Sequence, residues 1–457
     1  MTGRYKAYPA YVSSGKDYYG DIPEHWNLEK IKYNSYVKGR QGWQNLRADE
    51  YQDVGPYLVT GSHFDNKGGV DWNACYRVSE ERYERDRDIW IKSGDVLMTK
   101  DGTIGKIAFV DSLPYKACLN SHLLIIRDLY SKYDQRFLYH LLTSTAFKGF
   151  IPTRQSGTTF MGITQESVEE FPLVICPIEE QQKIANFLDH ETAKIDTLIE
   201  KQQQLIKLLK EKRQAVISHA VTKGLNPQAP MKDSGVEWLG EVPEHWVTKS
   251  YRYACKIYRG KFGHRPRNDP AFYDGEYPFI QTGDVARAGK MITSYSQTLN
   301  EKGKEVSQLF PAGTLMMAIA ANIGDTAILG FEAYAPDSVV GFKPYADLDI
   351  EFLRYSFMAA LPALEQTSTQ STQANLNVDR IGAVKAVFPS YDEQREIVEY
   401  LDRLLDQYDS IEKRCKKAIA LMQERRTALI SAAVTGKIDV RNWKSPISQD
   451  QALEQTA

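Results

Sequence analysis

The chain has 457 residues, a formal net charge of −2, 42% hydrophobic residues and 25% charged residues. One hydrophobic core rarely supports a chain of this length, so we expect at least two globular units. The sequence contains no run of about 18 apolar residues and opens with no charged-then-apolar signal segment, so we expect a cytoplasmic protein with no membrane partner.

The cysteines and the charge narrow the possible classes further. Five cysteines occur singly, without CxxC or Cys/His clusters, which argues against a disulfide framework and against structural zinc. We expect them to be small buried hydrophobic residues: Cys75, Cys118, Cys176, Cys255 and Cys415. Because the chain is close to neutral overall, any DNA-binding surface must be built from local basic clusters.

The first element is an arm that occurs twice. "SGKDYYGDIPEHW" (Ser14 to Trp26) aligns without a gap with "SGVEWLGEVPEHW" (Ser234 to Trp246), and the two PEHW motifs are 220 residues apart (243 − 23). Internal repeats can decide a whole fold, so this match organises the rest of the chain. We expect each PEHW tryptophan to anchor its arm in the core, and each PEHW histidine to pack or hydrogen-bond rather than catalyse.

A polar, basic stretch follows each arm. "KGRQGWQNLR" (Lys38 to Arg47) interleaves Arg, Gln, Asn and Trp, and "YRGKFGHRPRND" (Tyr258 to Asp269) carries five basic residues or histidines around two glycines. Arg and Lys can neutralise phosphates or contact guanine, while Gln and Asn suit adenine. One such stretch alone would be read as a solvated surface loop, but its recurrence at corresponding places favours DNA contact.

Strands that enter glycine turns come next in both copies. "PYLVTG" (Pro56 to Gly61) resembles "PFIQTG" (Pro278 to Gly283), and "GDVLMTKDGTIGKIAFV" (Gly94 to Val110) resembles "GTLMMAIAANIGDTAIL" (Gly313 to Leu329). Short apolar runs that end at glycine are typical of strands and tight turns. Each copy therefore contains a body of mixed strands and helices.

Polar loops accompany these strands and could contact phosphate or base. They are "TGSHFDNKGG" (Thr60 to Gly69), "TGDVARAGK" (Thr282 to Lys290), "PTRQSGTTF" (Pro152 to Phe160) and "EQTSTQSTQANLN" (Glu365 to Asn377). An ordinary flexible surface loop is the alternative interpretation of each. The sequence does not decide which residues read bases and which position the backbone.

Each copy ends in one long helix. The segment that begins "EEQQKIANFLD" matches the segment that begins "DEQREIVEYLD" without a gap, at a constant offset of 213 residues (393 − 180). Pro177 precedes the first helix, Ser390 and Glu393 can form a capping box at the second, and Gly224 and Gly436 mark the ends. A helix of about 40 residues is roughly 60 Å long, so it can act as a spacer.

Steps of three and four residues predict a seam along both helices. In the first helix the seam comprises Ile184, Leu188, Glu191, Ile195, Leu198, Gln202, Leu205, Leu209, Lys212, Val216 and His219. In the second it comprises Ile397, Leu401, Leu404, Tyr408, Ile411, Cys415, Ala418, Met422, Arg425, Leu429 and Ala432. We expect the two helices to pair antiparallel and to give the chain an approximate internal two-fold, rather than each packing only on its own body.

The arm, the GD-x-L strand, the proline before "EEQQKIANFLD" and the helix ends "RQAVISHAVTKG" and "RRTALISAAVTGKIDV" together resemble the DNA-specificity subunit of type I restriction-modification systems. The likeness runs from about Tyr11 to Val440. The resemblance implies a non-catalytic subunit with two target-recognition domains, each of which reads half of a split DNA site. It also implies partners: double-stranded DNA, two methyltransferase (modification) subunits and motor-nuclease (restriction) subunits.

No catalytic motif in the chain is complete. "DGTIGKI" (Asp101 to Ile107) lacks the first glycine and the final hydroxyl of a phosphate-binding loop, so we interpret it as a structural turn with Lys106 at most a phosphate contact. "DPAF" (Asp269 to Phe272) lacks the second proline of an amino-methyltransferase loop. We therefore expect no cofactor in this chain, and S-adenosylmethionine, ATP and Mg²⁺ in partner subunits.

The expected fold is of the α+β class, with two mixed α/β target-recognition domains in a pseudo-two-fold tandem repeat, separated by two long helices that form an antiparallel coiled coil. The predicted boundaries are 11–176 for body one, 177–224 for the first helical spacer, 225–389 for body two, 390–437 for the second spacer and 441–457 for a disordered tail. The alternatives are a coiled-coil interaction scaffold with two ligand-binding domains, and a self-sufficient restriction-methylation enzyme, which the missing motifs disfavour.

The residues predicted to bind DNA lie in the polar loops of both bodies. They are Arg40, Gln41, Trp43, Gln44, Asn45, Arg47, Ser62, His63, Lys67, Lys100, Arg154, Gln155, Ser156 and Thr158 in body one, and Arg259, Lys261, His264, Arg265, Arg267, Asn268, Thr282, Arg287, Lys290, Gln370 and Gln373 in body two.

Overall fold

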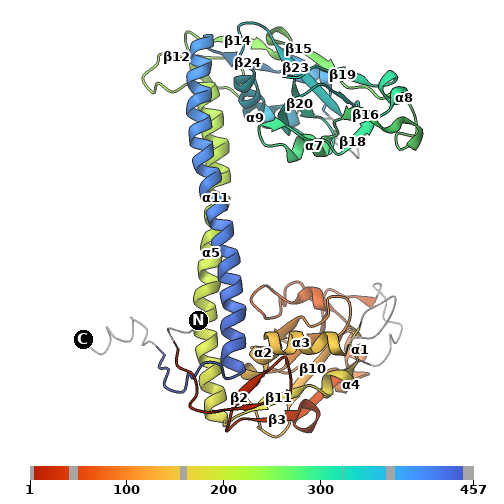
Figure 1. Ribbon diagram of the computed structural model, residues 1–457, viewed down its shortest axis with the longest axis vertical. Helices are drawn as coiled ribbons and strands as arrows, with labels where there is room; N and C mark the ends of the chain where they lie inside the picture. Colours follow the sequence, from red (N-terminus) through yellow and green to blue (C-terminus); the bar gives the residue numbers. More distant parts are fainter. Residues whose placement is uncertain (1–4, 41–49, 155–161, 322, 367–375, 446–457) are drawn as a thin grey trace. The chain divides into compact units, whose positions relative to one another are not determined.

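The computed structural model describes residues 5–40, 50–154, 162–321, 323–366 and 376–445. The chain divides into two compact units, unit 1 (Met1–Gln203 with Lys416–Ala457) and unit 2 (Gln204–Cys415). Helices α5 (Ile178–Lys223) and α11 (Tyr391–Val434) each continue from one unit into the other (Figure 1). Each unit therefore contains one body and a part of both long helices.

The body of unit 1 is built from short strands and helices around a four-stranded antiparallel sheet of order β4-β10-β7-β8. A second sheet has the order β6-β5-β9, and two further pairs are β1-β2 and β11-β3. The strands are β1 (Tyr11–Ser13), β2 (Asp21–Pro23), β3 (Asn27–Lys30), β4 (Ser35–Gly39), β5 (Tyr57–Val59), β6 (Tyr76–Arg77), β7 (Val96–Thr99), β8 (Ile107–Phe109), β9 (Ala117–Leu119), β10 (Leu123–Asp128) and β11 (Pro172–Ile175). The helices are α1 (Glu80–Glu84), α2 (Gln135–Thr143), α3 (Thr145–Phe150) and α4 (Gln165–Glu169).

The apolar run of β10 explains how this sheet separates two cores. Successive side chains of a strand point to opposite faces. Leu124 and Ile126 belong to the core under α2 and α3, whereas Leu123 and Ile125 belong to the core shared with the β6-β5-β9 sheet. A strand that is buried on both faces has no polar alternation, which is why "LLII" reads as a continuous apolar run.

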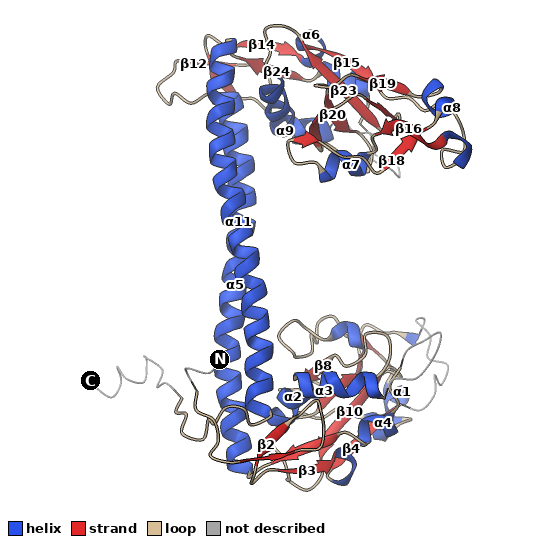
Figure 2. Ribbon diagram, viewed as in Figure 1, coloured by secondary structure: helices blue, strands red, loops and turns tan. Residues whose placement is uncertain are grey.

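Unit 2 has the same central arrangement with one additional strand. Its main sheet has the order β15-β23-β20-β21-β17, a second sheet has the order β18-β16-β22-β19, and β14-β24 and β12-β13 pair separately. The strands are β12 (Met231–Asp233), β13 (Glu241–Pro243), β14 (Val247–Ser250), β15 (Cys255–Arg259), β16 (Tyr273–Phe279), β17 (Met291–Ile292), β18 (Gln297–Leu299), β19 (Gln308–Phe310), β20 (Leu315–Ala318), β21 (Thr326–Leu329), β22 (Ala333–Ala335), β23 (Val339–Pro344) and β24 (Lys385–Phe388). The helices are α6 (Tyr251–Ala254), α7 (Thr282–Arg287), α8 (Glu301–Glu305), α9 (Ile350–Gln366) and α10 (Val378–Ala383), and Figure 2 shows α9 beside the sheet.

The predicted strand-and-turn segments are confirmed in both units. "VLMT" forms β7 and "LMMA" forms β20, and each is followed by a hairpin to its neighbour, β8 or β21. The turn between β7 and β8 contains Gly102 and Gly105, both with positive φ, which fits the structural interpretation of "DGTIGKI". All five cysteines are buried, as expected.

The two long helices pack side by side and antiparallel. In unit 1, Arg426 Nε of α11 donates to Asp196 Oδ1 of α5 at 2.9 Å. In unit 2, Arg213 of α5 pairs with Asp409 of α11. The contact moves forward 17 residues on α5 (213 − 196) and back 17 on α11 (426 − 409), as an antiparallel pair requires. The two ion pairs are also related by the 213-residue offset, because Asp409 and Arg426 repeat Asp196 and Arg213.

The predicted seam is correct at its ends and wrong in the middle. Leu198 and Leu205, which we expected in the seam, are 50% and 39% exposed, whereas their neighbours Ile199 and Ile206 are partly buried. The same shift occurs in α11, where Ile411 is 37% exposed. A straight α-helix drifts about 20° per heptad against a 3.5-residue repeat, so the contacting face moves to the next residue as the helix advances.

Each PEHW motif binds a glutamate at the start of a long helix. In unit 1, Glu180 accepts hydrogen bonds from Trp26 Nε1 at 3.1 Å and from Tyr8 Oη at 2.6 Å, and His25 Nε2 lies 3.0 Å from its second oxygen. In unit 2, Glu393 contacts Trp246 and His245 at the same 3.1 and 3.0 Å. The expected anchoring of the tryptophans is confirmed: Trp26 is 2% and Trp246 1% exposed.

The PEHW motifs also contact the end of the other long helix. Gly224 and Gly436 end α5 and α11 in the left-handed conformation, with φ of 75° and 71°. A Cβ on Gly436 would lie 2.2 Å from Pro23, and one on Gly224 would lie 3.2 Å from the ring of Trp246. Only glycine therefore lets each motif fit between the start of one helix and the end of the other.

The segment after α11 packs on the N-terminal arm within unit 1. Asp439 N donates to Lys6 O at 2.7 Å, and Lys437 Nζ donates to Asp21 O at 2.6 Å. Trp443 lies edge-on to Phe187, with ring centroids 5.6 Å apart. The predicted disordered tail, 441–457, thus starts too early, because residues 441–445 are described and Trp443 is packed; residues 446–457 lie outside the described residues.

Replacing Glu180 with Gln should destabilise unit 1 selectively, by about 1–3 kcal/mol, because its buried carboxylate accepts several hydrogen bonds. Glu393→Gln is the matched variant in unit 2 and should cost less, since Glu393 is 27% exposed against 6% for Glu180 and has no tyrosine donor. Hydrogen exchange in urea, read peptide by peptide, separates the two units. Equal losses in both units from either variant would contradict this assignment.

Candidate nucleic-acid interface

The polar loops of unit 1 meet at one end of its main sheet. Lys100 follows β7, and its ammonium lies near Gly39 at the end of β4: a Cβ on that glycine would be 3.8 Å from Lys100 Nζ. Lys100 N donates to His122 O at 2.9 Å, and Ile163 N donates to Lys100 O at 2.8 Å. Three of the predicted segments, 38–47, 60–69 and 152–160, therefore adjoin the same turn, because a Cβ on Gly61 would also contact Thr99.

The corresponding loops of unit 2 meet in the same way. Gly260 N, after β15, donates to Val339 O at 2.9 Å, and Lys261 N donates to Ala335 O at 3.1 Å. Leu376 N donates to Ile319 O at 3.0 Å, which repeats the bond between Ile163 and Lys100 at the 213-residue offset. The two units thus carry equivalent loop clusters at equivalent sheet ends.

Several predicted contacts of body one have no surface to offer. Arg40 and His63 are each only 4% exposed, and His63 Nδ1 accepts a bond from Thr60 N at 3.1 Å that fixes the turn. Burial lowers the pKa of both side chains, and for Arg40 the neighbouring Arg82 adds to the effect. Neither side chain can touch DNA in this conformation, because the fold uses it internally. Ser62 and Arg154 are exposed.

The remaining predicted residues of these loops lie outside the described residues. They are Gln41, Trp43, Gln44, Asn45, Arg47, Gln155, Ser156, Thr158, Gln370 and Gln373. Their assignment to DNA binding stays a prediction.

The basic loop of body two is held in place by a carboxylate. Arg265 Nη2 and Arg267 Nη2 donate to Asp337 Oδ2 at 3.2 and 2.6 Å, and both arginines remain exposed. His264 lies 3.1 Å from Asp269 and stacks on Phe272 with ring centroids 4.1 Å apart. The loop therefore presents arginines whose positions are fixed in advance, as phosphate and guanine recognition require.

Other predicted residues of body two lie beside this loop or on α7. Arg259, Lys261 and Asn268 are exposed, and Thr282 is partly so. Arg287, at the end of α7, pairs with Asp284 at 2.5 Å. These residues stay candidates for DNA contact.

Two lysines predicted to bind DNA contact a long helix instead. Lys67 Nζ lies 3.2 Å from Glu200 of α5, and Lys290 Nζ lies 2.5 and 2.8 Å from Glu351 and Asp402, the latter on α11. Burial acts to lower the pKa of Lys290, but hydrogen bonds to Asp402 and Glu351 outweigh it, and the pKa lies above its usual value. Both lysines come from equivalent loops, so this contact is a feature of both units.

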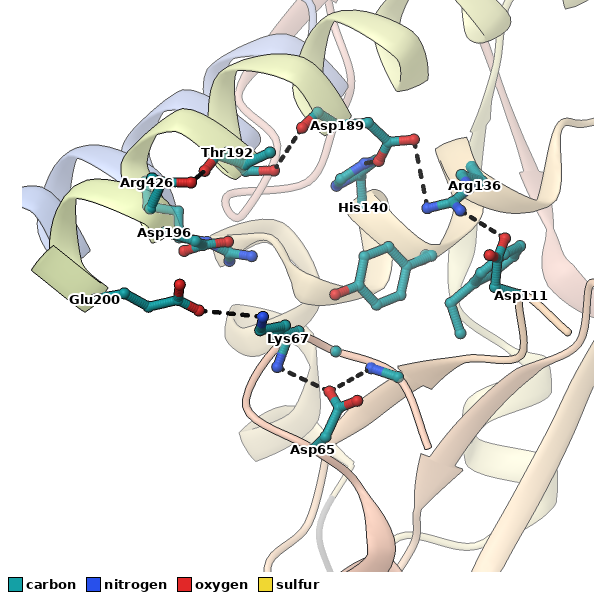
Figure 3. A pocket seen from close by; sticks show the side chains of 16 residues that line it. Asp65, Lys67, Asp111, Arg136, His140, Asp189, Thr192, Asp196, Glu200 and Arg426 are labelled. Carbon is teal, nitrogen blue, oxygen red and sulfur yellow. Dashed lines mark hydrogen bonds and ion pairs between the residues drawn. The ribbon is translucent and has the colours of Figure 1, made fainter. Parts of the chain in front are cut away.

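A repeated aspartate of each long helix holds the body of its unit. Asp189 of α5 accepts from His140 Nε2 at 2.8 Å and lies 3.4 Å from Arg136, both on α2. Asp402, its counterpart at the 213-residue offset, accepts from Tyr355 Oη of α9 at 2.6 Å. Figure 3 shows the unit 1 contacts around a cavity of about 480 Å³ between α5 and the body.

A repeated glutamine completes this attachment. Gln181 accepts from Asp134 N at 2.9 Å and donates to Cys176 O at 2.7 Å, and Gln394 makes the same bonds to Asp349 N and Pro389 O. Our sequence prediction missed this glutamine and this aspartate as positioning residues. The signal was present, because both lie in the gap-free match of "EEQQKIANFLD" with "DEQREIVEYLD".

A family model for the type I restriction modification DNA specificity domain matches residues 41–208 and 243–421, that is, both halves of the chain. The chain belongs to this specificity-domain family. Its two matched segments each include a body and most of a long helix, in agreement with the repeat. No helix of the described residues of this specificity-domain protein is long and apolar enough to cross a membrane.

Curated relatives of this specificity-domain protein match over nearly their full length. The putative type I restriction enzyme MjaX specificity subunit of Methanocaldococcus jannaschii is 23% identical over 92% of this chain and 96% of its own. The type I restriction enzyme EcoKI specificity subunit of Escherichia coli is 22% identical over 93% and 92%.

Solved structures share the fold of the specificity-domain protein. A chain from a structure of complex assembly and conformational transition of the type I R-M system superposes with a TM-score of 0.69, at 17% identity, over 90% of this chain and 98% of its own. The HsdS subunit from Thermoanaerobacter tengcongensis gives a TM-score of 0.51, at 18% identity, over 91% and 98%.

The contact between His140 and Asp189 predicts a pH dependence that is specific to unit 1. Burial lowers the pKa of His140 although Asp189 opposes it, so the folded state keeps this histidine neutral while the unfolded chain binds a proton below about pH 6.5. Stability is therefore lost as pH falls through that value, by up to about 1.4 kcal/mol per pH unit.

His140→Gln removes the titrating group but can still donate to Asp189, so its unfolding free energy should depend less on pH between about 7.5 and 5.5. Unit 2, with Tyr355 in this place, provides the internal control in the same hydrogen-exchange measurement. Identical pH profiles of unit 1 in the wild type and the variant would refute the assignment.

Proposed function

We propose that this chain is the non-catalytic sequence-specificity subunit of a type I restriction-modification enzyme. Each body binds one half of a bipartite double-stranded DNA site. The observation that carries the proposal is the equivalent cluster of polar loops at the same sheet end in both units. Membership of the specificity-domain family in both halves supports it.

The physical basis of recognition lies in how the loops are held. Arginines that are aligned by Asp337 can neutralise phosphates or clamp guanine without first being ordered, while the mobile reach of the body is limited by its attachment to the long helices. Phosphate contacts would fix register, and base contacts would supply sequence preference. Different loops in the two bodies imply two different half-sites.

The partner subunits supply the chemistry. Two modification subunits and the motor-nuclease restriction subunits bind this chain, and S-adenosylmethionine, ATP and Mg²⁺ act in those partners. The relatives that support this partnership are themselves described as specificity subunits of restriction enzymes. The complex works on DNA in the cytoplasm.

The test is selection of DNA from a random pool by the full chain together with its modification subunits. We expect two short defined half-sites separated by a gap of fixed length. Selection of one ungapped site, or of no sequence, would contradict the proposal. Retention of a protein in place of DNA would favour the interaction-scaffold alternative.

Lengthening both long helices should lengthen the gap and leave the half-sites unchanged. The repeat offset and the antiparallel register place the point after Gln204 opposite the point after Lys417. Seven residues inserted at both points add about 10 Å of helix, or about three base pairs at 3.4 Å each. The same selection reads the gap, and insertion in only one helix, which disrupts the pairing, is the control. An unchanged gap would remove the spacer role.

Exposed apolar residues on the long helices mark where the modification subunits dock. Leu198 and Leu421 of unit 1 are 50% and 56% exposed, and Leu208 and Ile411 of unit 2 are 60% and 37% exposed. Each pair repeats the other at the 213-residue offset, as two copies of one partner require. Exposed apolar side chains at repeated positions on paired helices favour a protein partner.

Leu198→Lys with Ile411→Lys should reduce co-purification of both modification subunits by at least about tenfold, because a charge in the centre of an interface is costly. Gln203→Lys with Lys416→Glu changes exposed positions of the same helices without removing an apolar side chain. That control should leave co-purification unchanged. Equal losses from both double variants would exclude a docking role for Leu198 and Ile411.

A further inference from the structure

A pocket of about 480 Å³ lies in body two between two of its predicted DNA-binding loops. Phe262, Tyr273 and Phe279 line one part of it, and Asn268, Gln281 and Gln297 line another. The three rings form one cluster, with centroids 5.6 to 6.1 Å apart. The pocket thus combines an aromatic wall with carboxamides, and its volume lies within the range of sites that hold small organic groups.

One carboxamide of this pocket is oriented by a neighbour. Gln281 Nε2 donates to Gln297 Oε1, and the backbone N–H of Gln281 is itself fixed by Asp284 Oδ2 at 2.9 Å. Nε2 of Gln297 makes no hydrogen bond with any described residue. The Gln297 amide is therefore held by its oxygen while its N–H donors remain available to a ligand in the pocket.

The charges around the pocket separate the ligand from its phosphate. Arg267, on the rim, is bound by Asp337 and stays exposed, whereas the carboxylate of Asp274 also lines the pocket. An aromatic wall, neutral amides and a carboxylate do not suit a phosphate. They suit a flat, uncharged ring with hydrogen-bonding edges, and an exposed arginine at the rim suits the phosphate attached to it.

We infer that this pocket receives one nucleobase of the bound DNA, turned out of the duplex, with an acceptor edge of that base facing Gln297 Nε2. The inference rests on the proposed function, since it requires body two to bind DNA. A base that remains stacked is read by side chains that project into the groove. A concave site with an aromatic wall instead encloses a whole base and stacks on it, as sites for everted bases do.

Gln297→Glu tests the donor role without removing the side chain. One carboxylate oxygen keeps the bond from Gln281, while the other replaces the N–H donors with an acceptor. In selections with the full chain and its modification subunits, this variant should change the preferred base at one position of one half-site to a base that offers a donor. Gln297→Ala should only lose the preference there, by about tenfold.

Gln308→Glu is the matched control, because Gln308 lies in the same sheet, bonds its own backbone region at Leu309 O and does not line the pocket. It should leave both half-sites unchanged. The half-site that Gln297→Glu does not alter is the internal control for folding of the other body. A half-site preference unchanged in both Gln297 variants would overturn the inference while leaving the gapped site, and so the proposed function, intact.

A second measurement tests whether the base leaves the duplex. The base at the altered position is kept, and only its pairing partner is replaced by an abasic nucleotide. If the base is turned out, the cost of unpairing is removed in advance and the wild-type complex should bind several-fold more tightly. Unchanged or weaker binding would show that the base is read in the stack and would overturn the pocket as its site.

Discussion

The buried carboxylate at the start of each long helix is the contact on which the remaining structure depends. Glu180 and Glu393 accept bonds from the tryptophan of a PEHW motif and lie beside its histidine, while Gly436 and Gly224 bring the end of the other helix against the same motif. Three segments that are distant in sequence thus meet at one buried acceptor. Because a buried carboxylate without its donors is costly, the helix start, helix end and arm fold as one cooperative junction.

This junction explains why the chain keeps two copies of an unusual tetrapeptide. Proline closes the arm hairpin, paired with Tyr11 in unit 1 and with Met231 in unit 2, and the tryptophan supplies both apolar volume and one N–H donor. The aspartate and glutamine further along each helix then attach the rest of the body. The repeated residues therefore belong to the frame, and the unrepeated loops are free to differ.

Sequence alone predicted most of this frame and little of the loop chemistry. The gap-free repeat predicted α5 and α11 to within a few residues, because helix signals and an internal copy agree at every step. It misplaced Leu198 and Leu205, since a 3.5-residue pattern and a 3.6-residue helix diverge over several turns.

The loop residues were harder because residue type does not reveal burial. Arg40 and His63 have side chains suited to DNA, yet the fold encloses them, and Lys67 and Lys290 are committed to carboxylates of their own units. Gln297 attracts no attention in the sequence, since only the folded chain shows that Gln281 holds its oxygen. Such roles depend on contacts between segments that no local pattern records.

The distribution of repeated and unrepeated contacts also accounts for how one chain can read two different half-sites with a fixed separation. The helix pairing is fixed by Asp196 with Arg426 and by Arg213 with Asp409, and the bodies are attached through the same acids and amides in both units. Changes within the loops do not alter these contacts. Selection can therefore act on loops such as 258–269 without disturbing the spacing, whereas a change in the frame would shift both half-sites at once.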